Sequence, residues 1–340
     1  MSEAGKQSPA ASTRPLLQIK GVKMHFPVRE GIFMRAKKAL RAVDGVDLTL
    51  ASGETLGLVG ESGCGKSTLG RCITRLYRPT AGQILFEGTN LAPLSRSALK
   101  PFRRQIQMVF QDPVDSLNSR HTVGQILEEP FIIHRQGAAA ERWRRVQELL
   151  DHVGMPKGAA DKFPFEFSGG QRQRIGIARA IALRPKLIVC DEPVSALDVS
   201  IQSQVLNLFM DLQREMGLSY IFIAHNLAVV KHISDRVAIM YLGNILELAD
   251  ADAIYQSPRH PYTKALLSAI PVPDPARKRE RIVLSGDVPS PIHPPSGCVF
   301  HTRCPSVTER CRIEKPLLRV VDDSGKTPHQ VACHYAESEG

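Results

Sequence analysis

The sequence predicts an α/β fold whose core is a parallel β-sheet with helices on both faces. Four continuous apolar runs carry this prediction: TLGLVG (55–60), QIQMVFQ (105–111), KLIVCDE (186–192) and SYIFIAH (219–225). Such runs are typical of strands buried on both faces, and strands that alternate with helices form parallel sheets. Each run ends in polar residues. Because ligands bind at the carboxyl edge of such sheets, we expect those residues to form one site.

Residues 15–55 follow a different pattern. LLQIKGVKMHF and ALRAVDGVDLTLASGE alternate and break in the manner of antiparallel strands, and PVREGIFMRAKK between them predicts a basic loop. The preceding residues 1–14 contain no apolar segment of the kind found in secretory signals. We predict that they form a disordered leader.

Two amphipathic patterns predict crossover helices. ERWRRVQELLDHVG ends at Gly154, a helix C-cap, and SIQSQVLNLFMDLQREMG ends at Gly217 in the same way. The buried stripe of the first pattern is expected to contain Trp143, Val146, Leu149, Leu150 and Val153.

The stretch GESGCGKST, residues 60–68, matches the pattern G-x-x-x-x-G-K-[ST]. Its glycines let consecutive backbone N–H groups face phosphate oxygens, and the following helix adds the positive end of its dipole. We expect Lys66 to reach the β- and γ-phosphates and Ser67 to bind Mg²⁺. The alternative, a glycine-rich turn that binds nothing, is disfavoured by the strand before it and the helix after it. The predicted cradle consists of Gly60, Glu61, Ser62, Gly63, Cys64, Gly65, Lys66, Ser67 and Thr68.

Two carboxylates follow the run KLIVC. Asp191, at the end of the predicted strand, is placed to hold Mg²⁺, and Glu192 is placed to orient or deprotonate an attacking water. A solvated strand terminus is the plainer alternative. The buried run before the pair argues against it.

The segment FSGGQRQR, residues 167–174, opens a predicted helix 23 residues before Asp191. Together with the phosphate loop and the carboxylates, it resembles the signature of ATP-binding cassette (ABC) ATPases. The resemblance covers about residues 15–260 and implies a P-loop NTPase: a RecA-like core, an antiparallel β subdomain, and a helical subdomain at about 112–165. One departure is Phe167, where the family usually has leucine. The catalytic groups that the resemblance implies are Glu192, His225, Lys66 and Gln111.

The same resemblance implies how the nucleotide is held. Gln111 matches the Q-loop, which contacts Mg²⁺, and His225 matches the switch histidine, although a packed histidine is the alternative. Phe26 matches the aromatic residue that stacks on adenine. In this family two cassettes meet head to tail around two ATP molecules, so that one chain contacts the ATP held by its partner. The residues expected at that interface are Ser168, Gly169, Gly170, Gln171 and the D-loop residue Asp198.

The C-terminal segment makes the resemblance more specific: it is similar to the ATPase subunits of bacterial dipeptide and oligopeptide importers, and most to the second of their two ATPase chains. It carries His-Pro-Tyr at 260–262, followed by LSGDVPSPIHPPSGCVFHTRC. This implies an ATPase domain at 15–255 and a proline-dense, loop-rich extension at 256–340. It also implies a second, different ATPase chain, two transmembrane permease subunits, and indirectly a periplasmic peptide-binding protein. The chain would lie at the cytoplasmic face of the plasma membrane, where its ATP hydrolysis would drive the uptake of peptides into the cell.

Four cysteines gather near the C-terminus: Cys298, Cys304, Cys311 and Cys333. Four thiolates can hold zinc or an iron–sulfur cluster. The C-x2-C pairs of zinc ribbons are missing, so the wide spacing favours a [4Fe–4S] cluster, with His301 and His334 as substitute ligands. Four free thiols are the alternative. Two further cysteines, Cys72 and Cys190, are expected in the core.

Composition limits the compartment and the partners of the protein less strictly than the motifs do. Seven cysteines without a secretory signal favour a reducing compartment, and no run approaches the ~20 apolar residues of a membrane span. A net charge of +10 permits contact with nucleic acid or an anionic membrane face.

An ABC-type ATPase acting on nucleic acid or the ribosome is therefore the alternative function. One cassette per chain and no coiled-coil insertion argue against it, so no nucleic acid partner is expected. A third possibility is an interaction module with a vestigial ATPase, but the intact catalytic residues disfavour it.

Overall fold

A computed structural model describes residues 14–30, 35–112, 116–270, 282–325 and 327–336 of the chain. The leader predicted at 1–14 therefore lies outside the described residues, apart from Arg14. Within the described ranges, none of the helices combines the length and apolar character needed to cross a bilayer.

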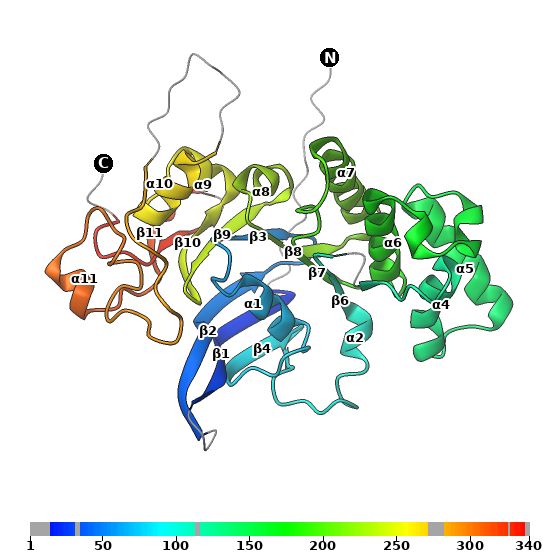
Figure 1. Cartoon of the computed structure of the whole chain (residues 1–340), viewed down its shortest axis with the longest axis horizontal. Helices are drawn as coiled ribbons and strands as arrows, with labels where there is room; N and C mark the ends of the chain where they lie inside the picture. The colour runs from blue at the N-terminus through cyan, green and yellow to red at the C-terminus, as the bar shows by residue number, and fades with distance from the viewer. Residues whose placement is uncertain (1–13, 31–34, 113–115, 271–281, 326, 337–340) are drawn as a thin grey trace, which may run out of the picture.

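An eight-stranded sheet forms the centre, in the order β11-β12-β10-β9-β3-β8-β7-β6 (Figure 1). The four predicted runs are its neighbouring parallel strands β3, β8, β7 and β6, which confirms the parallel core. β9 continues this parallel set, whereas β10, β12 and β11 are antiparallel additions. The strands are β3 Thr55–Val59, β6 Ile106–Val109, β7 Leu187–Asp191, β8 Ser219–Ala224, β9 Arg236–Tyr241, β10 Asn244–Asp250, β11 Arg319–Asp322 and β12 His329–Val331.

Alternate residues of the central strands belong to two separate hydrophobic cores, one on each face of the sheet. In β8, Tyr220 and Phe222 belong to one core, and Ile221 and Ile223 belong to the other. Burial on both faces is the reason that these strands read as unbroken apolar runs. The two core cysteines, Cys72 and Cys190, are fully buried as expected.

A second, four-stranded antiparallel sheet has the order β2-β1-β4-β5. Its strands are β1 Leu17–Glu30, β2 Arg35–Leu50, β4 Ala81–Phe86 and β5 Thr89–Asn90. The two predicted antiparallel strands are confirmed as β1 and β2. The predicted loop between them is too long, because β1 continues to Glu30 and β2 begins at Arg35. The pairing of Val28 with Lys38 shows that the hairpin ladder continues through charged residues.

Helices pack around the central sheet, and α4, α5 and α6 form a helical lobe that joins the sheet through α6, which contacts β6 and α7 (Figure 1). Helix α5 contains the predicted stripe, but Trp143 is 43% exposed and covers Gly124, whereas Val146 and Leu150 are fully buried. The helices are α1 Lys66–Ile73, α2 Phe102–Gln105, α4 Val123–Ile133, α5 Ala139–His152, α6 Gly169–Ile181, α7 Val199–Met216, α8 Leu227–Ile233, α9 Ala251–Gln256, α10 Pro261–Ser268 and α11 Glu309–Ile313, with short 3-10 turns at Lys157–Asp161 and Pro164–Glu166.

The C-terminal extension is more integrated into the fold than its proline content predicts. His-Pro-Tyr opens helix α10, in which Pro261 occupies the first turn and the His260 side chain caps the helix. Strands β11 and β12 then join the central sheet through β10. The expected loop-rich character holds for residues 282–308, which contain no helix or strand, whereas α10 before them and β11 and β12 after them add regular structure.

Candidate functional site

The glycine-rich loop connects β3 to α1 and is held by hydrogen bonds between its own residues. The Lys66 side chain is buried, and its Nζ donates hydrogen bonds to the carbonyl oxygens of Gly60 at 2.8 Å and Glu61 at 2.9 Å. Gly65 immediately precedes α1 with φ at +107°, and a Cβ on it would lie 2.0 Å from the Ala42 carbonyl oxygen. Only glycine fits there. The loop holds a cation and the free N–H groups of a helix N-terminus in one place, which is the chemistry of a phosphate site.

A hydroxyl and a carboxylate meet beside this loop. Ser67 Oγ donates a hydrogen bond to Asp191 Oδ1 at 2.6 Å, although 124 residues separate them in sequence. Burial raises the pKa of Asp191, and the hydrogen bond from Ser67 partly offsets this effect. A hydroxyl oxygen and a carboxylate oxygen are the donor types that Mg²⁺ prefers, so this pair fits that ion.

Two side chains from the neighbouring strand ends converge on the next residue, Glu192. Glu192 Oε2 accepts a hydrogen bond from Gln111 Nε2 at 3.1 Å and lies 3.3 Å from His225 Nδ1. Gln111 follows β6, Glu192 follows β7 and His225 follows β8, so the parallel order of the strands brings them together. The sequence predicts that Gln111 takes part in catalysis and contacts Mg²⁺. Its amide contacts Glu192. Among the described residues, no hydrogen bond joins it to Asp191 or Ser67.

Glu192 has a left-handed backbone, with φ at +46°. This conformation is costly for a side chain other than glycine and asparagine, and it occurs preferentially at functional sites. Its N–H donates to the Ile223 carbonyl oxygen at 3.0 Å, which ties the strained residue to the neighbouring strand. The carboxylate is mostly buried, whereas the His225 side chain is 56% exposed. A water bound beside this pair would therefore contact a fixed carboxylate and an accessible imidazole.

The predicted signature turn lies at the start of α6, in the lobe away from α1 (Figure 1). Ser168 caps the helix: its Oγ accepts from the Gln171 N–H, and the Gln171 side chain accepts from the Ser168 N–H. A Cβ on Gly170 would lie 2.5 Å from Ile201 Cγ2 of α7, the helix that Asp198 begins. Within the described part of the chain, no hydrogen bond or ion pair joins this turn to the phosphate loop. One chain therefore does not bring the two predicted halves of the site together.

The predicted adenine contact, Phe26, lies in β1 and packs edge-on against Tyr77, with ring centroids 5.6 Å apart. Sequence reasoning missed Tyr77, which has no motif of its own. It also missed two residues of the C-terminal extension that contact the phosphate loop, Tyr262 and Arg303. His-Pro-Tyr marked the first of these as notable, but nothing in the sequence linked it to a loop 201 residues away.

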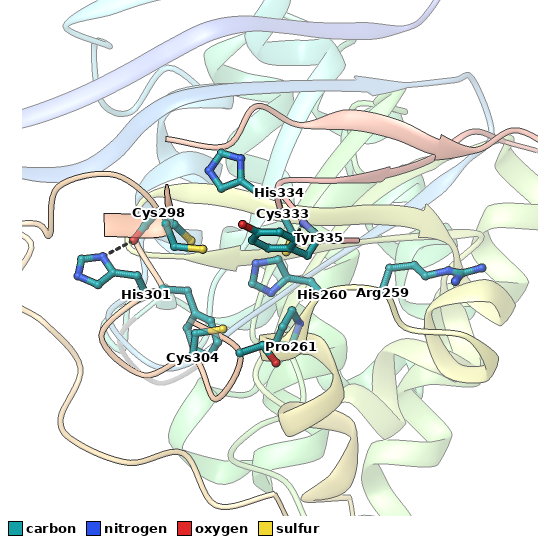
Figure 2. A pocket seen from close by; sticks show the side chains of 12 residues that line it. Arg259, His260, Pro261, Cys298, His301, Cys304, Cys333, His334 and Tyr335 are labelled. Atoms are coloured by element: carbon teal, nitrogen blue, oxygen red, sulfur yellow. Dashed lines mark hydrogen bonds between the residues drawn. The ribbon is translucent and has the colours of Figure 1, made fainter. Parts of the chain in front are cut away.

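The four C-terminal cysteines line one cavity together with His260, His301 and His334 (Figure 2). The cavity has a volume of about 30 Å³, roughly that of one water molecule. Burial raises the pKa of Cys298 to about 11, and the other three cysteines add to the shift. Convergence of the thiols is thus observed. However, among the described residues no three His, Cys, Asp or Glu side chains are arranged to hold a metal ion, so the thiols as they lie do not form the expected cluster site.

Comparisons with known proteins decide the family. The model of the ABC transporter family matches residues 43–195, and that of the oligopeptide/dipeptide transporter C-terminal region matches residues 246–311. The chain is 54% identical to the oligopeptide transport ATP-binding protein AppF of Bacillus subtilis over 328 residues, which cover 96% of this chain and 98% of that protein. This chain belongs to the oligopeptide-transport ATP-binding proteins of the ABC transporter family.

Further relatives agree with this assignment. The oligopeptide transport ATP-binding proteins OppF of Salmonella typhimurium and Escherichia coli are 53% and 52% identical, each over 94% of this chain and 95% of its own length. The fold resembles the dimeric cassette MJ0796 bound to ADP and Pi, with a TM-score of 0.62 and 28% identity over 69% of this chain and 98% of that chain. As a member of this family the chain is an ABC-type ATPase, and the expected P-loop NTPase fold is confirmed.

Proposed function

We propose that this chain binds ATP with Mg²⁺ at the edge formed by the phosphate loop, Asp191 and Glu192, and that hydrolysis there drives peptide import. The observation that carries the assignment is the convergence of Gln111 and His225 on the Glu192 carboxylate, beside the Ser67–Asp191 pair. All five residues follow or adjoin the carboxyl ends of neighbouring parallel strands, where such sheets bind ligands.

Each group has a distinct task in this proposal. Lys66, now held by two carbonyl oxygens of its own loop, transfers its hydrogen bonds to the β- and γ-phosphates. Ser67 and Asp191 would hold Mg²⁺, which neutralises phosphate charge when bound. Glu192 orients and deprotonates the attacking water, while Gln111 fixes the carboxylate and His225 contacts the γ-phosphate. Phe26 supports the adenine ring.

A second cassette completes the site. Ser168 and Gly170 sit at an exposed helix N-terminus that is separate from the phosphate loop of the same chain, which supports a head-to-tail pair in which each signature turn meets the partner's ATP. The family resemblance gives the partner as a different ATPase chain. Asp198, which begins α7 without a side-chain cap, is proposed to contact that partner.

A basic depression supports contact with the permease subunits at the cytoplasmic face of the plasma membrane. A cavity of about 500 Å³ is lined by Arg75, Arg78, Arg96 and Arg103, with no acidic side chain among its lining residues and with Leu76 55% exposed at its rim. An acidic, partly apolar cytoplasmic segment of a permease subunit fits this surface. The names of the relatives give peptides as the cargo, and uptake of labelled di- and oligopeptides by cells lacking this chain tests that assignment.

For the cysteine cavity we propose a [4Fe–4S] cluster, with zinc as the second choice. The convergence of Cys298, Cys304, Cys311 and Cys333 supports it, although the thiols must move from their present positions to admit a cluster, and no step of ATP hydrolysis is assigned to it. Iron and sulfide in protein purified without air would support the cluster. Colourless, iron-free protein would leave four free thiols in its place.

Two substitutions test the nucleotide site. Glu192→Gln removes the base but keeps the shape and the acceptor oxygen, so ATP should still bind while turnover falls by at least about a hundredfold. Lys66→Ala should lose ATP binding itself, because the loop loses its only buried cation. Equilibrium binding and phosphate release measure the two effects separately. Turnover at the wild-type rate in Glu192→Gln would show that another group is the base.

A further inference from the structure

Glu61, the second residue of the phosphate loop, is held through its main chain and its side chain at once. Its N–H donates a hydrogen bond to Tyr262 Oη at 2.9 Å, and its carboxylate accepts from Arg303 Nη1 at 2.8 Å. Its carbonyl oxygen accepts from Lys66 Nζ at 2.9 Å. Two of these three contacts come from the C-terminal extension, which lies about 200 residues or more away in sequence.

Both contacts from the extension are made by side chains that are largely shielded from solvent. Tyr262 is fully buried, and the Arg303 side chain is only 9% exposed, against 27% for Glu61. The Arg303 guanidinium also lies over the Tyr241 ring, 6.0 Å from its centroid. Although burial acts to lower the pKa of Arg303, the hydrogen bond and charge of Glu61 raise it overall. Ion pairs with this little solvent are screened far less than surface pairs.

An aromatic layer links these contacts to the cysteine cavity. Phe300 packs against Tyr241 and Tyr262, with centroid distances of 5.4 and 5.3 Å, and against His260 at 5.6 Å. Phe300 and His260 also line the cavity of the four cysteines (Figure 2 labels His260). Arg303 directly precedes Cys304. The wall of the cysteine cavity and the support of the phosphate loop are therefore one packed unit.

We propose that Arg303 and Tyr262 are positioning residues that fix Glu61, and through it the phosphate loop, so that the C-terminal extension of each chain shapes its own nucleotide site. This inference rests on the proposed nucleotide site. It deepens that proposal, because it assigns to the extension a direct effect on nucleotide affinity.

The position of Glu61 matters because its carbonyl oxygen is one of the two loop carbonyl oxygens that hold the Lys66 ammonium, and it also accepts from the Cys64 N–H at 3.3 Å. A shift of Glu61 would therefore move the lysine and the loop N–H groups together. Among the described residues, no hydrogen bond or ion pair joins Glu192, Gln111 or His225 to Glu61, so the chemical step should be spared. The two effects separate kinetically: affinity changes and turnover does not.

The experiment compares Arg303→Ala and Tyr262→Phe with wild type by the KM for ATP, the kcat and the Kd for ADP. We expect the KM and the Kd to rise about tenfold in Arg303→Ala, which corresponds to ~1.4 kcal/mol, with kcat changed by less than about twofold. Tyr262→Phe keeps the buried ring and removes only the hydroxyl acceptor, so it should raise both constants about threefold. Arg303→Lys should recover part of the affinity, because it keeps the charge but loses the forked geometry.

Arg310→Ala is the matched control. Arg310 lies in the same extension and pairs with Glu314 at 2.7 Å on the exposed surface, so its loss should leave all three constants unchanged. Thermal unfolding of each variant identifies any that fail to fold. If Arg303→Ala fails to fold, Tyr262→Phe alone tests the inference. Wild-type KM and Kd in folded Arg303→Ala and Tyr262→Phe, alongside lost binding in Lys66→Ala, would overturn this inference and leave the nucleotide site standing. If Lys66→Ala still bound ADP normally, the site proposal and this inference would both be wrong.

Discussion

The backbone conformation and the free space at single residues determine whether the proposed nucleotide site can form. Gly60 is fixed by space, because a Cβ there would lie 2.1 Å from the Met240 carbonyl oxygen, and Gly65 is fixed by both space and a positive φ. Glu192 adopts a left-handed backbone without being glycine, which places its carboxylate between Gln111 and His225. At this scale, strain and close backbone approach are tolerated where they orient the groups that we propose to contact the nucleotide.

Two glycines of the phosphate loop provide a matched test of this view. Gly65→Ala should lower the free energy of unfolding by about 3 kcal/mol and abolish ATP binding, because its Cβ would collide with backbone at 2.0 Å. Gly63→Ala should cost only about 1 kcal/mol: its φ is +77°, but nothing lies within 4 Å of the new Cβ. Urea unfolding and ATP binding of both variants measure the difference. Equal losses would show that φ alone, and not the contact with Ala42, controls the loop.

Sequence patterns predicted the residues of the catalytic edge because each follows an apolar run, and parallel pairing aligns the ends of such runs. They could not predict Arg303 or Tyr262. The contact between Arg303 and Glu61 spans 242 residues and depends on how a proline-dense segment folds back on the core. Nor could they predict the extra strands β11 and β12, which are only 4 and 3 residues long and too short to show a period.

At the scale of elements, the C-terminal extension is joined to the core by a buried polar group. Glu247 in β10 is fully buried, and its carboxylate accepts from the N–H groups of Arg259 and His260 and lies 2.7 Å from His329 Nε2 in β12. One carboxylate thus connects the central sheet, the start of α10 and the added strand β12. Burial alone would raise the pKa of Glu247, but the hydrogen bond with His329 and the other donors lower it overall.

His260 gives this junction a pH dependence. Burial lowers its pKa from 6.5 to about 4, with Glu247 acting in the opposite direction. Because the unfolded chain binds a proton near pH 6.5 and the folded chain does not, stability is complete above that pH and falls as the pH drops towards 4. We expect the fall between pH 7.5 and pH 5 to be about 2 kcal/mol smaller in His260→Asn, which keeps a side-chain acceptor for the helix cap. Urea unfolding at the two pH values measures this; an equal fall in both proteins would exclude His260 as the cause.

For the whole molecule, the separation of the phosphate loop from the signature turn is the property that most affects function. The loop lies beside the antiparallel sheet, whereas Ser168 begins α6 in the helical lobe (Figure 1). We propose that a chain built in this way holds two half-sites that face different ATP molecules. The extension, by contrast, contacts the phosphate loop of its own chain through Glu61. ATP hydrolysis should therefore depend on pairing, and nucleotide affinity on the extension.

Mixing two inactive variants tests the dependence on pairing. Lys66→Ala removes one half-site and Ser168→Arg blocks the other, so each variant alone should be inactive. Where the chain pairs with itself, random pairing of equal amounts makes half of the dimers mixed, each with one intact composite site, so about a quarter of the wild-type ATPase rate should return. Wild-type chain that is inactive until a second ATPase chain is added would assign the other cassette to that chain. An active Ser168→Arg monomer, identified by light scattering and hydrolysing ATP in proportion to its concentration, would contradict the paired site.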